Sequence, residues 1–396
     1  MHILEIVSFL PPYGGYFAIE QAEALQQAGG RVGMLYCQQL GITVDGVWTW
    51  LRGNGSGFMV HGSGVMGHGF DFVGRFFRGM PRAIRANEER FCGIVSEMFD
   101  EYVSRYGRPD VLHAQAAKWA GVAAMGISRR TGIPYFVTEH FSRGSYDMDF
   151  GRGWTHDLWA RDLIRECYEN ARCVIPVAEE LVEDTACYFG RDYRYEAVSN
   201  ITDVEFFVPP VPRRERSHDP FRFCCLAIAN RGEFYRKGYD VLARALRGVN
   251  GCELHVAGRD TDSRRFRRLF EKYYGARMPE SVVVHGDLSR EGVRDLLYRC
   301  DALVLASRSE VQPLVVLEAL STGIPVVGTE AIPQNERIAG GVVIARTGDA
   351  TSLVDGMRRV MAIGPQEGLH DRVVEISSAV SVSRRLMAVF NGGRPL

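Results

Sequence analysis

Residues 302–328 read ALVLASRSEVQPLVVLEALSTGIPVVG. An apolar run (ALVLAS) leads into a polar turn, then come apolar residues at helical spacing, and after Thr322-Gly323 a second apolar run (IPVVG) follows. The order strand, helix, strand is a βαβ unit, which requires parallel strands joined by a right-handed crossover. We therefore expect an α/β fold, with the polar turn at the carboxyl end of a strand.

The same alternation extends upstream of this stretch. Strand-like runs at 221–230, 252–258 and 281–286 alternate with helical patterns at 237–249, 262–275 and 290–300. The N-terminal part has strand-like runs at 2–9, 31–37, 111–115, 134–140 and 173–178, with helical patterns at 18–30, 118–130 and 157–170. The sequence thus predicts two doubly wound, Rossmann-like parallel-sheet domains facing a cleft.

The length of 396 residues fits two domains. A stretch rich in proline and charge, DVEFFVPPVPRRERSHDP at 203–220, predicts the connection between them. We expect an N-terminal domain at 1–204, a linker at 205–220, a C-terminal domain at 221–365, and a helical segment at 366–396 that packs back on the first domain.

Composition excludes several classes of protein. The 47 basic and 48 acidic residues give a net charge of −1, and 46% of residues are hydrophobic, which argues against disorder and against a broad nucleic-acid-binding surface. The nine cysteines form no C-x-x-C pair and are odd in number, which indicates a reducing cytoplasm. No run reaches the roughly 18 apolar residues of a spanning helix, so we expect a soluble or peripheral protein.

Residues 38–108 do not fit the alternation. Seven glycines fall between Gly53 and Gly69, and FDFVGRFFRGMPRAIR follows at 70–85. A phosphate loop and a membrane-facing patch are one interpretation of the two stretches. A mobile loop followed by a half-buried helix or hairpin is the interpretation that we favour.

Two turns of the C-terminal domain carry chemistry. In the first, Arg231 and Lys237 flank the start of a helix after the strand at 221–230, an arrangement suited to a diphosphate. Lys237 is one of only three lysines, the others being Lys118 and Lys272. A solvated basic turn is the alternative.

The second turn carries two carboxylates. Glu310 precedes the helix of the quoted stretch, and Glu318 lies within it beside Leu317 and Ala319. A charged group in such an apolar setting normally needs a partner, and a sugar hydroxyl would serve. A helix cap and a surface residue are the alternatives for these two carboxylates.

These motifs together carry a resemblance. Glu310 and Glu318 form an E-x7-E motif; with STGIPVVG, the Arg231/Lys237 pair and Gly14-Gly15, the chain resembles the retaining GT-B glycosyltransferases of family four. PDVLHAQ, IPYFVTEH and VSNITDVEFFVPP resemble further segments of that family, so the resemblance spans nearly the whole chain.

The resemblance implies a role for each matched position. Arg231, Lys237, Glu310 and His140 would be catalytic. In the donor site, Arg231 and Lys237 would bind the diphosphate, and the N–H groups of Leu314 and Val315 would face the phosphate. Glu318 would bind the ribose and Glu310 the donor sugar. Gly286-Asp287-Leu288 would border the base, and Gly15 would also belong to the donor site. The acceptor site would include Gly14, Gly15, Tyr16, Gln115 and His140.

The chain also departs from the family pattern. His113-Ala114-Gln115 lacks the second histidine of many members, so Gln115 offers only hydrogen bonds. Val311-Gln312-Pro313 replaces a frequent glycine-aromatic-glycine, which bears on the shape of the donor pocket. Asp147-Met148-Asp149 and Asp260-Thr261-Asp262 match a metal-binding D-x-D pattern, but Arg231 and Lys237 already supply positive charge, so we expect no metal.

The sequence therefore predicts a retaining, hexosyltransferase-type glycosyltransferase. It would move a sugar from a nucleotide diphosphate sugar to a hydroxyl of a glycan or lipid-linked glycan, without cofactor, metal or nucleic acid, in bacterial surface polysaccharide or glycoconjugate assembly. We expect it in the cytoplasm or at the inner face of the cytoplasmic membrane. A GT-B-fold sugar-nucleotide epimerase and a noncatalytic sugar-nucleotide-binding subunit remain alternatives.

Overall fold

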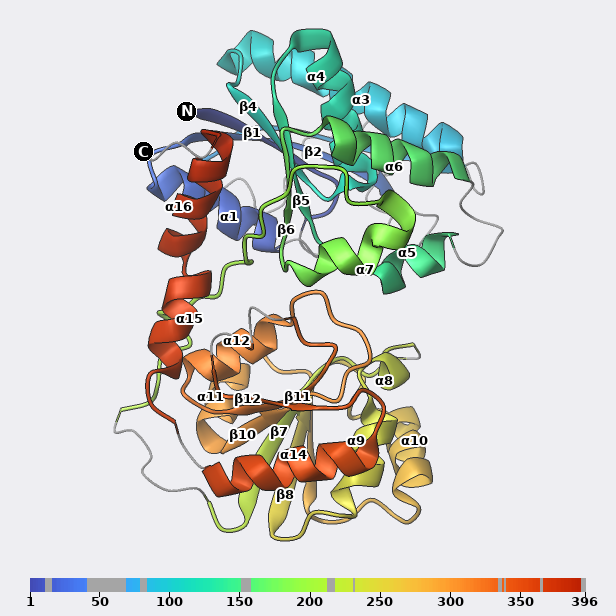
Figure 1. Cartoon of the computed structure of the whole chain (residues 1–396), viewed down its shortest axis with the longest axis vertical. Helices are drawn as coiled ribbons and strands as arrows, with labels where there is room; N and C mark the ends of the chain where they lie inside the picture. The colour runs from blue at the N-terminus through green and yellow to red at the C-terminus, as the bar shows by residue number, and fades with distance from the viewer. Residues whose placement is uncertain are drawn as a thin grey trace. The chain divides into compact units, whose positions relative to one another are not determined.

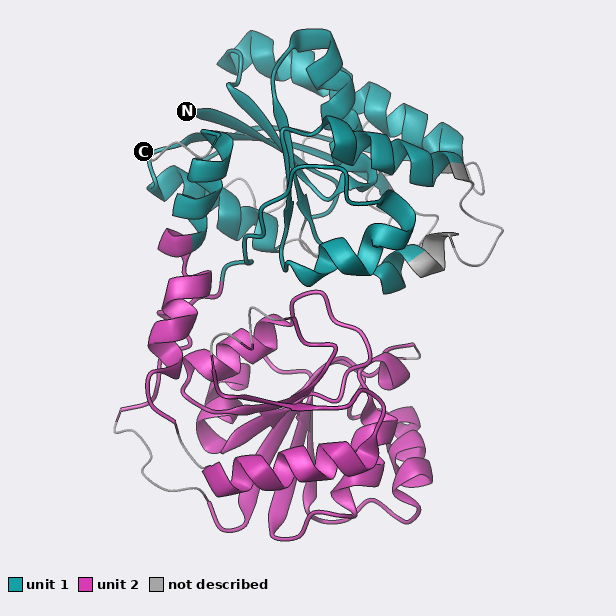
Figure 2. Ribbon diagram, viewed as in Figure 1, with its two compact units in different colours: residues 1–201, 382–396 teal, residues 202–381 magenta. Residues whose placement is uncertain are grey.

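A computed structural model of the chain describes residues 1–10, 16–40, 69–78, 84–150, 158–211, 218–230, 232–333, 337, 340–363 and 366–392 (Figure 1). The chain divides into two compact units (Figure 2). Unit 1 comprises Met1–Ile201 and Val382–Leu396, and unit 2 comprises Thr202–Ser381.

Unit 1 is built on a parallel sheet of six strands in the order β3-β2-β1-β4-β5-β6. The strands are β1 (His2–Val7), β2 (Arg31–Leu40), β3 (Asp71–Arg78), β4 (Val111–Gln115), β5 (Tyr135–Glu139) and β6 (Cys173–Pro176). All residues of β4, β5 and β6 are buried, as expected for parallel strands covered by helices on both faces.

Helices follow the strands of unit 1 in sequence. They are α1 (Tyr16–Gln27), α3 (Ile84–Tyr106), the short π-helical turn η2 (Ala117–Gly121), α4 (Val122–Thr131), α5 (Arg143–Phe150), α6 (Leu158–Asn170) and α7 (Glu180–Phe189). The C-terminal helix α16 (Ala379–Phe390) also packs in this unit, where Phe390 contacts His113 and Phe136 at ring-centroid distances of 5.0 and 4.9 Å.

Unit 2 repeats the architecture with the strand order β12-β11-β10-β7-β8-β9. Its strands are β7 (Phe221–Leu226), β8 (Cys252–Ala257), β9 (Val282–Gly286), β10 (Ala302–Val304), β11 (Val326–Thr329) and β12 (Val342–Ala345). Its helices are α8 (Glu233–Arg236), α9 (Tyr239–Leu246), α10 (Arg264–Tyr274), α11 (Arg290–Arg299), α12 (Leu314–Ser321), α14 (Ala350–Ile363) and α15 (Leu369–Ser377).

When the strands of each unit are numbered from one, both sheets have the order 3-2-1-4-5-6. In unit 1 the strand order reverses between β1 and β4. In unit 2 it reverses between β7 and β10. Ligands of open α/β sheets bind at such switch points, outside the carboxyl ends of the strands. The prediction of two doubly wound sheets is confirmed, and each sheet now has a defined place for a ligand.

Several elements differ from the sequence expectations. Residues 71–78 form β3, an edge strand parallel to β2, and neither a helix nor a hairpin. Phe77 is buried there against Phe91, and Arg75 pairs with Glu97 and Glu101 of α3. The glycine-rich stretch between Gly53 and Gly69 lies almost entirely outside the described residues. Unit 2 has a sixth strand, β12, that the alternation did not reveal.

Two further observations concern the chain as a whole. All nine cysteines are free thiols. Within the described ranges, no helix combines the length and the low polarity that crossing a bilayer would need.

Candidate active site

The turn after β7 brings Lys237 to the switch point of unit 2. The chain leaves β7, forms the single turn α8, and enters α9 through Gly238, which adopts a left-handed conformation at φ +69°. A Cβ atom at Gly238 would lie 1.8 Å from the carbonyl oxygen of Ala306, just after β10. Only glycine therefore lets the Lys237 turn pack directly on the loop that follows β10.

Lys237 and Glu310 form an ion pair at this point. The ammonium Nζ of Lys237 lies 2.7 and 3.0 Å from the two carboxylate oxygens of Glu310. The two side chains are only 14% and 6% exposed. The structure thus joins a cation and a carboxylate that the sequence assigned to two separate motifs, 73 residues apart.

A second ion pair holds the two loops together. The guanidinium of Arg308 donates to both carboxylate oxygens of Asp240, at 2.7 and 2.8 Å, and to the carbonyl oxygen of Tyr235 at 2.5 Å. Hydrogen bonding to Asp240 raises the pKa of the Arg308 guanidinium. Two-pronged pairs of this kind fix orientation as well as distance.

Arg236 strengthens the same connection. Its guanidinium pairs with Glu233 and donates to the carbonyl oxygen of Ser309 at 2.7 Å, while its own carbonyl accepts the backbone N–H of Arg308 at 2.7 Å. The segment that carries Glu310 is thereby attached to the segment that carries Lys237 by backbone and side-chain bonds.

The other predicted donor-site residues occupy neighbouring strand ends. Leu314 and Val315 are the first two residues of α12, whose initial N–H groups point away from the helix, and Glu318 lies half-buried one turn further along. Gly286 ends β9 in a left-handed conformation, and Asp287 and Leu288 follow it. These residues and the Lys237–Glu310 pair all follow the carboxyl ends of strands of the same sheet.

Three predicted residues cannot be placed. Arg231, Gly14 and Gly15 lie outside the described residues. Tyr16, the first residue of α1, is 65% exposed.

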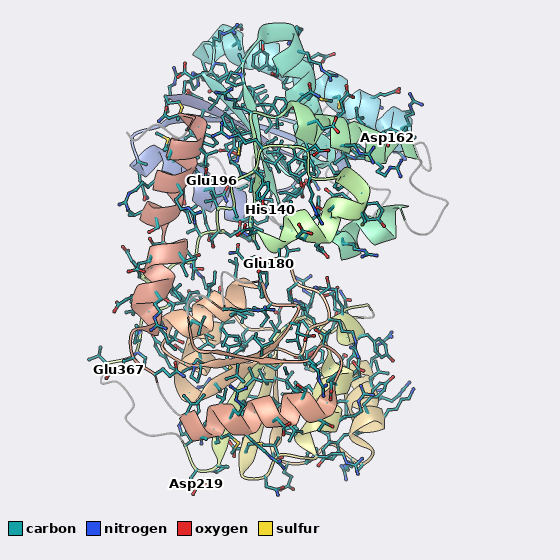
Figure 3. The ribbon with its side chains drawn as sticks, in the orientation of Figure 1. His140, Asp162, Glu180, Glu196, Asp219 and Glu367 are labelled. Atoms are coloured by element: carbon teal, nitrogen blue, oxygen red, sulfur yellow. The ribbon has the colours of Figure 1, made fainter. Side chains whose placement is uncertain are left out.

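His140 lies directly after β5 in unit 1, on the side of the sheet where the strands end (Figure 3). Its Nε2 is 2.9 Å from the side-chain oxygen of Gln115, and its ring packs on Phe17 with centroids 4.0 Å apart. Burial, and to a smaller extent the nearby His113, lowers the pKa of His140 to about 3. The imidazole is therefore neutral at neutral pH.

Glu139 fixes the backbone around His140. Its carboxylate accepts the N–H groups of His140 and Phe141, both at 2.8 Å, and that of Ala117 at 3.2 Å. It also accepts hydrogen bonds from the hydroxyls of Tyr146 and Tyr168. Complete burial raises the pKa of this carboxyl, while the hydrogen bonds act in the opposite direction.

A metal-ligand set is not found in the described part of the chain. There, no three His, Cys, Asp or Glu side chains converge as metal ligands would. Asp260 and Asp262 are both exposed, and the side chains of Asp147 and Asp149 are not described.

Sequence reasoning missed the residues that support Lys237, Glu310 and His140. Arg308 and Asp240 carry no motif, because an arginine in a polar turn and an aspartate in a helix are ordinary. Glu5 and Glu139 did leave a signal, since Glu5 lies between apolar residues of β1 and Glu139 ends the buried strand β5, at 0% and 2% exposure.

Two family descriptions match this chain. Residues 15–200 match "Glycosyl transferase 4-like domain", and residues 223–362 match "Glycosyl transferases group 1". Together they span most of both units.

Curated relatives match over part of their length. TuaC of Bacillus subtilis (strain 168), whose name assigns it to teichuronic acid biosynthesis as a glycosyltransferase, is 26% identical over 263 residues, which is 64% of this chain and 61% of TuaC. D-inositol 3-phosphate glycosyltransferase of Xylanimonas cellulosilytica is 28% identical over 234 residues, 55% of each chain. The chain thus aligns with about three fifths or less of these relatives.

Solved structures match over the full length. Sucrose-phosphate synthase from Thermosynechococcus elongatus has a TM-score of 0.71 at 16% identity, covering 99% of this chain and 98% of that one. HepE of Anabaena, solved in complex with UDP, has a TM-score of 0.70 at 15% identity, covering 99% and 100%. The two sheets, their switch points and both family matches agree, and the chain belongs to the GT-B glycosyltransferases of the family-four type.

Proposed function

We propose that this protein transfers a sugar from a nucleotide diphosphate sugar to a hydroxyl of a glycan or lipid-linked glycan. The observation that carries the proposal is the Lys237–Glu310 pair at the switch point of unit 2, held by a second, two-pronged ion pair. A cation in the turn after β7 and the initial N–H groups of α12, which follows β10 in the same sheet, are suited to a diphosphate, and a carboxylate to sugar hydroxyls.

The relatives support this class of reaction. TuaC is named a glycosyltransferase of teichuronic acid biosynthesis, and HepE was solved with UDP and with UDP-glucose. We assign the chain a hexosyltransferase role in bacterial surface polysaccharide or glycoconjugate assembly, with a nucleoside diphosphate as the leaving group.

The proposed chemistry is a front-side displacement with retention. The bond from the anomeric carbon to the diphosphate oxygen breaks, the acceptor oxygen bonds to the same face, and the acceptor proton passes to the departing phosphate. Lys237 and Arg231 offset the charge that grows on that phosphate, Glu310 orients the donor sugar, and no metal takes part in the proposal. His140 contributes a neutral imidazole beside the acceptor.

Ligand screening and product analysis test the proposal. Nucleotide sugars are added singly in a thermal-shift assay, and those that stabilise the protein are then incubated with glycan and lipid-linked acceptors. We expect a stabilising donor and a product with retained anomeric configuration. Epimerisation of the donor without acceptor, or donor binding without transfer to any acceptor, would support one of the two alternative functions instead.

The Lys237→Ala variant tests the residue assignment. It should lose transfer while keeping its far-ultraviolet circular dichroism, because Lys237 lies in the turn between α8 and α9 and bonds to Glu310, outside the apolar core of unit 2. Lys272→Ala is the matched control, since that lysine is exposed on α10 and should be dispensable. Unchanged turnover in Lys237→Ala would refute the assignment.

If the acceptor is a lipid-linked glycan, we predict that residues 70–85 contact the surface of the bilayer. Residues 79–83 of this stretch lie outside the described residues. Sedimentation with anionic vesicles tests it, and absence of binding would leave a water-soluble glycan as the acceptor.

A further inference from the structure

Five polar side chains form one continuous hydrogen-bonded chain through the sheet of unit 1. Thr138 Oγ1 lies 2.7 Å from His113 Nε2, His113 Nδ1 lies 2.7 Å from Glu5 Oε1, Glu5 Oε2 lies 3.0 Å from Gln115 Nε2, and Gln115 Oε1 lies 2.9 Å from His140 Nε2. The first four residues are 0% exposed. Burying so many polar groups costs free energy unless each one forms its hydrogen bonds. We therefore expect this hydrogen-bonded chain of side chains to have a function.

The carboxylate of Glu5 decides the direction of the bonds that lead to His140. A carboxylate only accepts hydrogen bonds, so the amide group that faces Glu5 must be the NH₂ of Gln115. The same NH₂ lies 3.1 Å from a second acceptor, the side-chain oxygen of Gln21. The oxygen of Gln115 is therefore left to face the imidazole, and His140 must donate to it through Nε2–H.

The second nitrogen of His140 is consequently an acceptor. A neutral imidazole carries a single N–H, and the bond to Gln115 places it on Nε2. Among the described residues, Nδ1 has no hydrogen-bond partner, while Phe17 and Glu139 hold the ring and the backbone of His140 in place.

We infer that Glu5 and Gln115 are positioning residues that keep His140 in the Nε2–H tautomer, so that Nδ1 accepts a hydrogen bond from a hydroxyl group of a sugar substrate. A hydroxyl fits this nitrogen because it can donate a proton, whereas a phosphate oxygen would meet a lone pair. The inference rests on the proposed function, and it adds the tautomer and the buried residues that impose it.

Nitrogen NMR on the full-length protein tests the tautomer without any assay of activity. The histidine rings are labelled with ¹⁵N, and the signals of His140 are identified by their loss in His140→Asn. We expect a protonated Nε2 and an unprotonated Nδ1 in the wild type. A protonated Nδ1 in the wild type would overturn the inference, whether or not the protein transfers sugar.

Two variants test the role of the buried hydrogen-bonded side chains. Gln115→Met keeps the volume but removes the acceptor that faces His140, and Glu5→Gln replaces a pure acceptor with a group that can also donate. Both should lower the fraction of His140 in the Nε2–H tautomer. Once a transfer assay exists, both should also reduce kcat/KM roughly tenfold, the effect of losing one hydrogen bond to substrate.

Thr138→Val is the matched control. It removes a bond at the far end of the same buried chain, between Thr138 and His113, and leaves the Glu5–Gln115–His140 part intact. We expect a lower melting temperature with an unchanged His140 spectrum. If Thr138→Val altered the His140 spectrum as much as Gln115→Met and Glu5→Gln, or if those two variants left it unchanged, the buried hydrogen-bonded side chains would have a structural role only. Failure of the proposed function would instead show as no transfer by a wild type with the expected tautomer.

Discussion

Arg308 shows how much of the proposed donor site depends on a residue that would not touch the donor. Its bonds to Asp240 and to the Tyr235 carbonyl attach the Glu310 loop to the Lys237 turn. Asp240 is 4% exposed, so its charge needs this partner.

Removal of this guanidinium should therefore affect both activity and stability. We expect Arg308→Ala to lower the free energy of unfolding by about 1–3 kcal/mol, because among the described residues Asp240 then keeps Arg244 alone as a charged partner. Arg308→Lys should recover part of the stability and a smaller part of the sugar-transfer activity, since an ammonium cannot form the two-pronged pair. Urea denaturation and steady-state kinetics measure the two effects, and a fully active Arg308→Ala would contradict the positioning role.

Glu88 of α3 is a second residue with a measurable consequence. It is 3% exposed, neither carboxylate oxygen has a hydrogen-bond partner among the residues that the structure describes, and burial, with a smaller effect from Glu89, raises the pKa of the carboxyl to about 8. The folded protein thus holds a proton that the unfolded chain releases near pH 4.5. Stability should therefore fall as pH rises from about 4.5 to about 8.

Glu88→Gln removes this proton linkage while keeping the shape of the side chain. We expect the variant to match the wild type near pH 4 and to be more stable at pH 8, by on the order of 4 kcal/mol. Chemical denaturation at several pH values measures the difference. Glu89→Gln, at an exposed neighbour, is the control: because it keeps Glu88, its stability should fall with pH as that of the wild type does. If Glu88→Gln showed the same pH dependence as Glu89→Gln, the buried carboxyl would not be its source.

At the scale of elements, α16 is the case in which a segment distant in sequence completes a unit. Its Phe390 is 7% exposed and packs on His113 of β4 and Phe136 of β5. We expect Phe390→Ala to destabilise unit 1 by about 3–5 kcal/mol, the usual cost of emptying a buried phenylalanine site. Val380, at the start of the same helix, is 63% exposed, and Val380→Ala should change the melting temperature little. Equal effects of the two variants would show that the packing of α16 on the sheet contributes nothing.

Some elements of the two sheets carry a clear sequence signal and others do not. The strands β7, β8, β10 and β11 are short apolar runs between helical patterns, so their type and order along the chain were predictable. The strand β3 was not, because Gly74 and Arg75 interrupt its apolar residues and the strand lies at the sheet edge, where full burial is not required. β12 is only four residues long and follows Gly340-Gly341, which hides a strand among turn residues.

The site shows the same division. Lys237, Glu310 and His140 were predictable, because each follows a strand and belongs to a recognisable motif. The Lys237–Glu310 pair, the Asp240–Arg308 pair and the Glu5–Gln115–His140 hydrogen bonds were not predictable, because each depends on which strands are neighbours in its sheet. The order β10-β7 and β1-β4-β5 brings together residues separated by as many as 110 positions.

At the scale of the whole molecule, each unit has its own core. The core of unit 1 includes Leu4, Leu112 and Val137, and that of unit 2 includes Phe223, Leu254 and Val304. Because the Lys237–Glu310 pair belongs to unit 2 alone, a nucleotide should stabilise the two units unequally.

Differential scanning calorimetry with UDP and other nucleoside diphosphates examines this difference. We expect one thermal transition to rise while the other stays in place, because a ligand at about 100 times its Kd stabilises the unit that binds it by about 2.7 kcal/mol. For a unit of this size that corresponds to a shift of roughly 5–10 °C. Phe390→Ala should identify the transition of unit 1 by lowering it, and Lys237→Ala should abolish the nucleotide shift of the other. If the nucleotide raised the transition that Phe390→Ala lowers, or if Lys237→Ala kept the full shift, the donor site would not lie at the strand ends of unit 2.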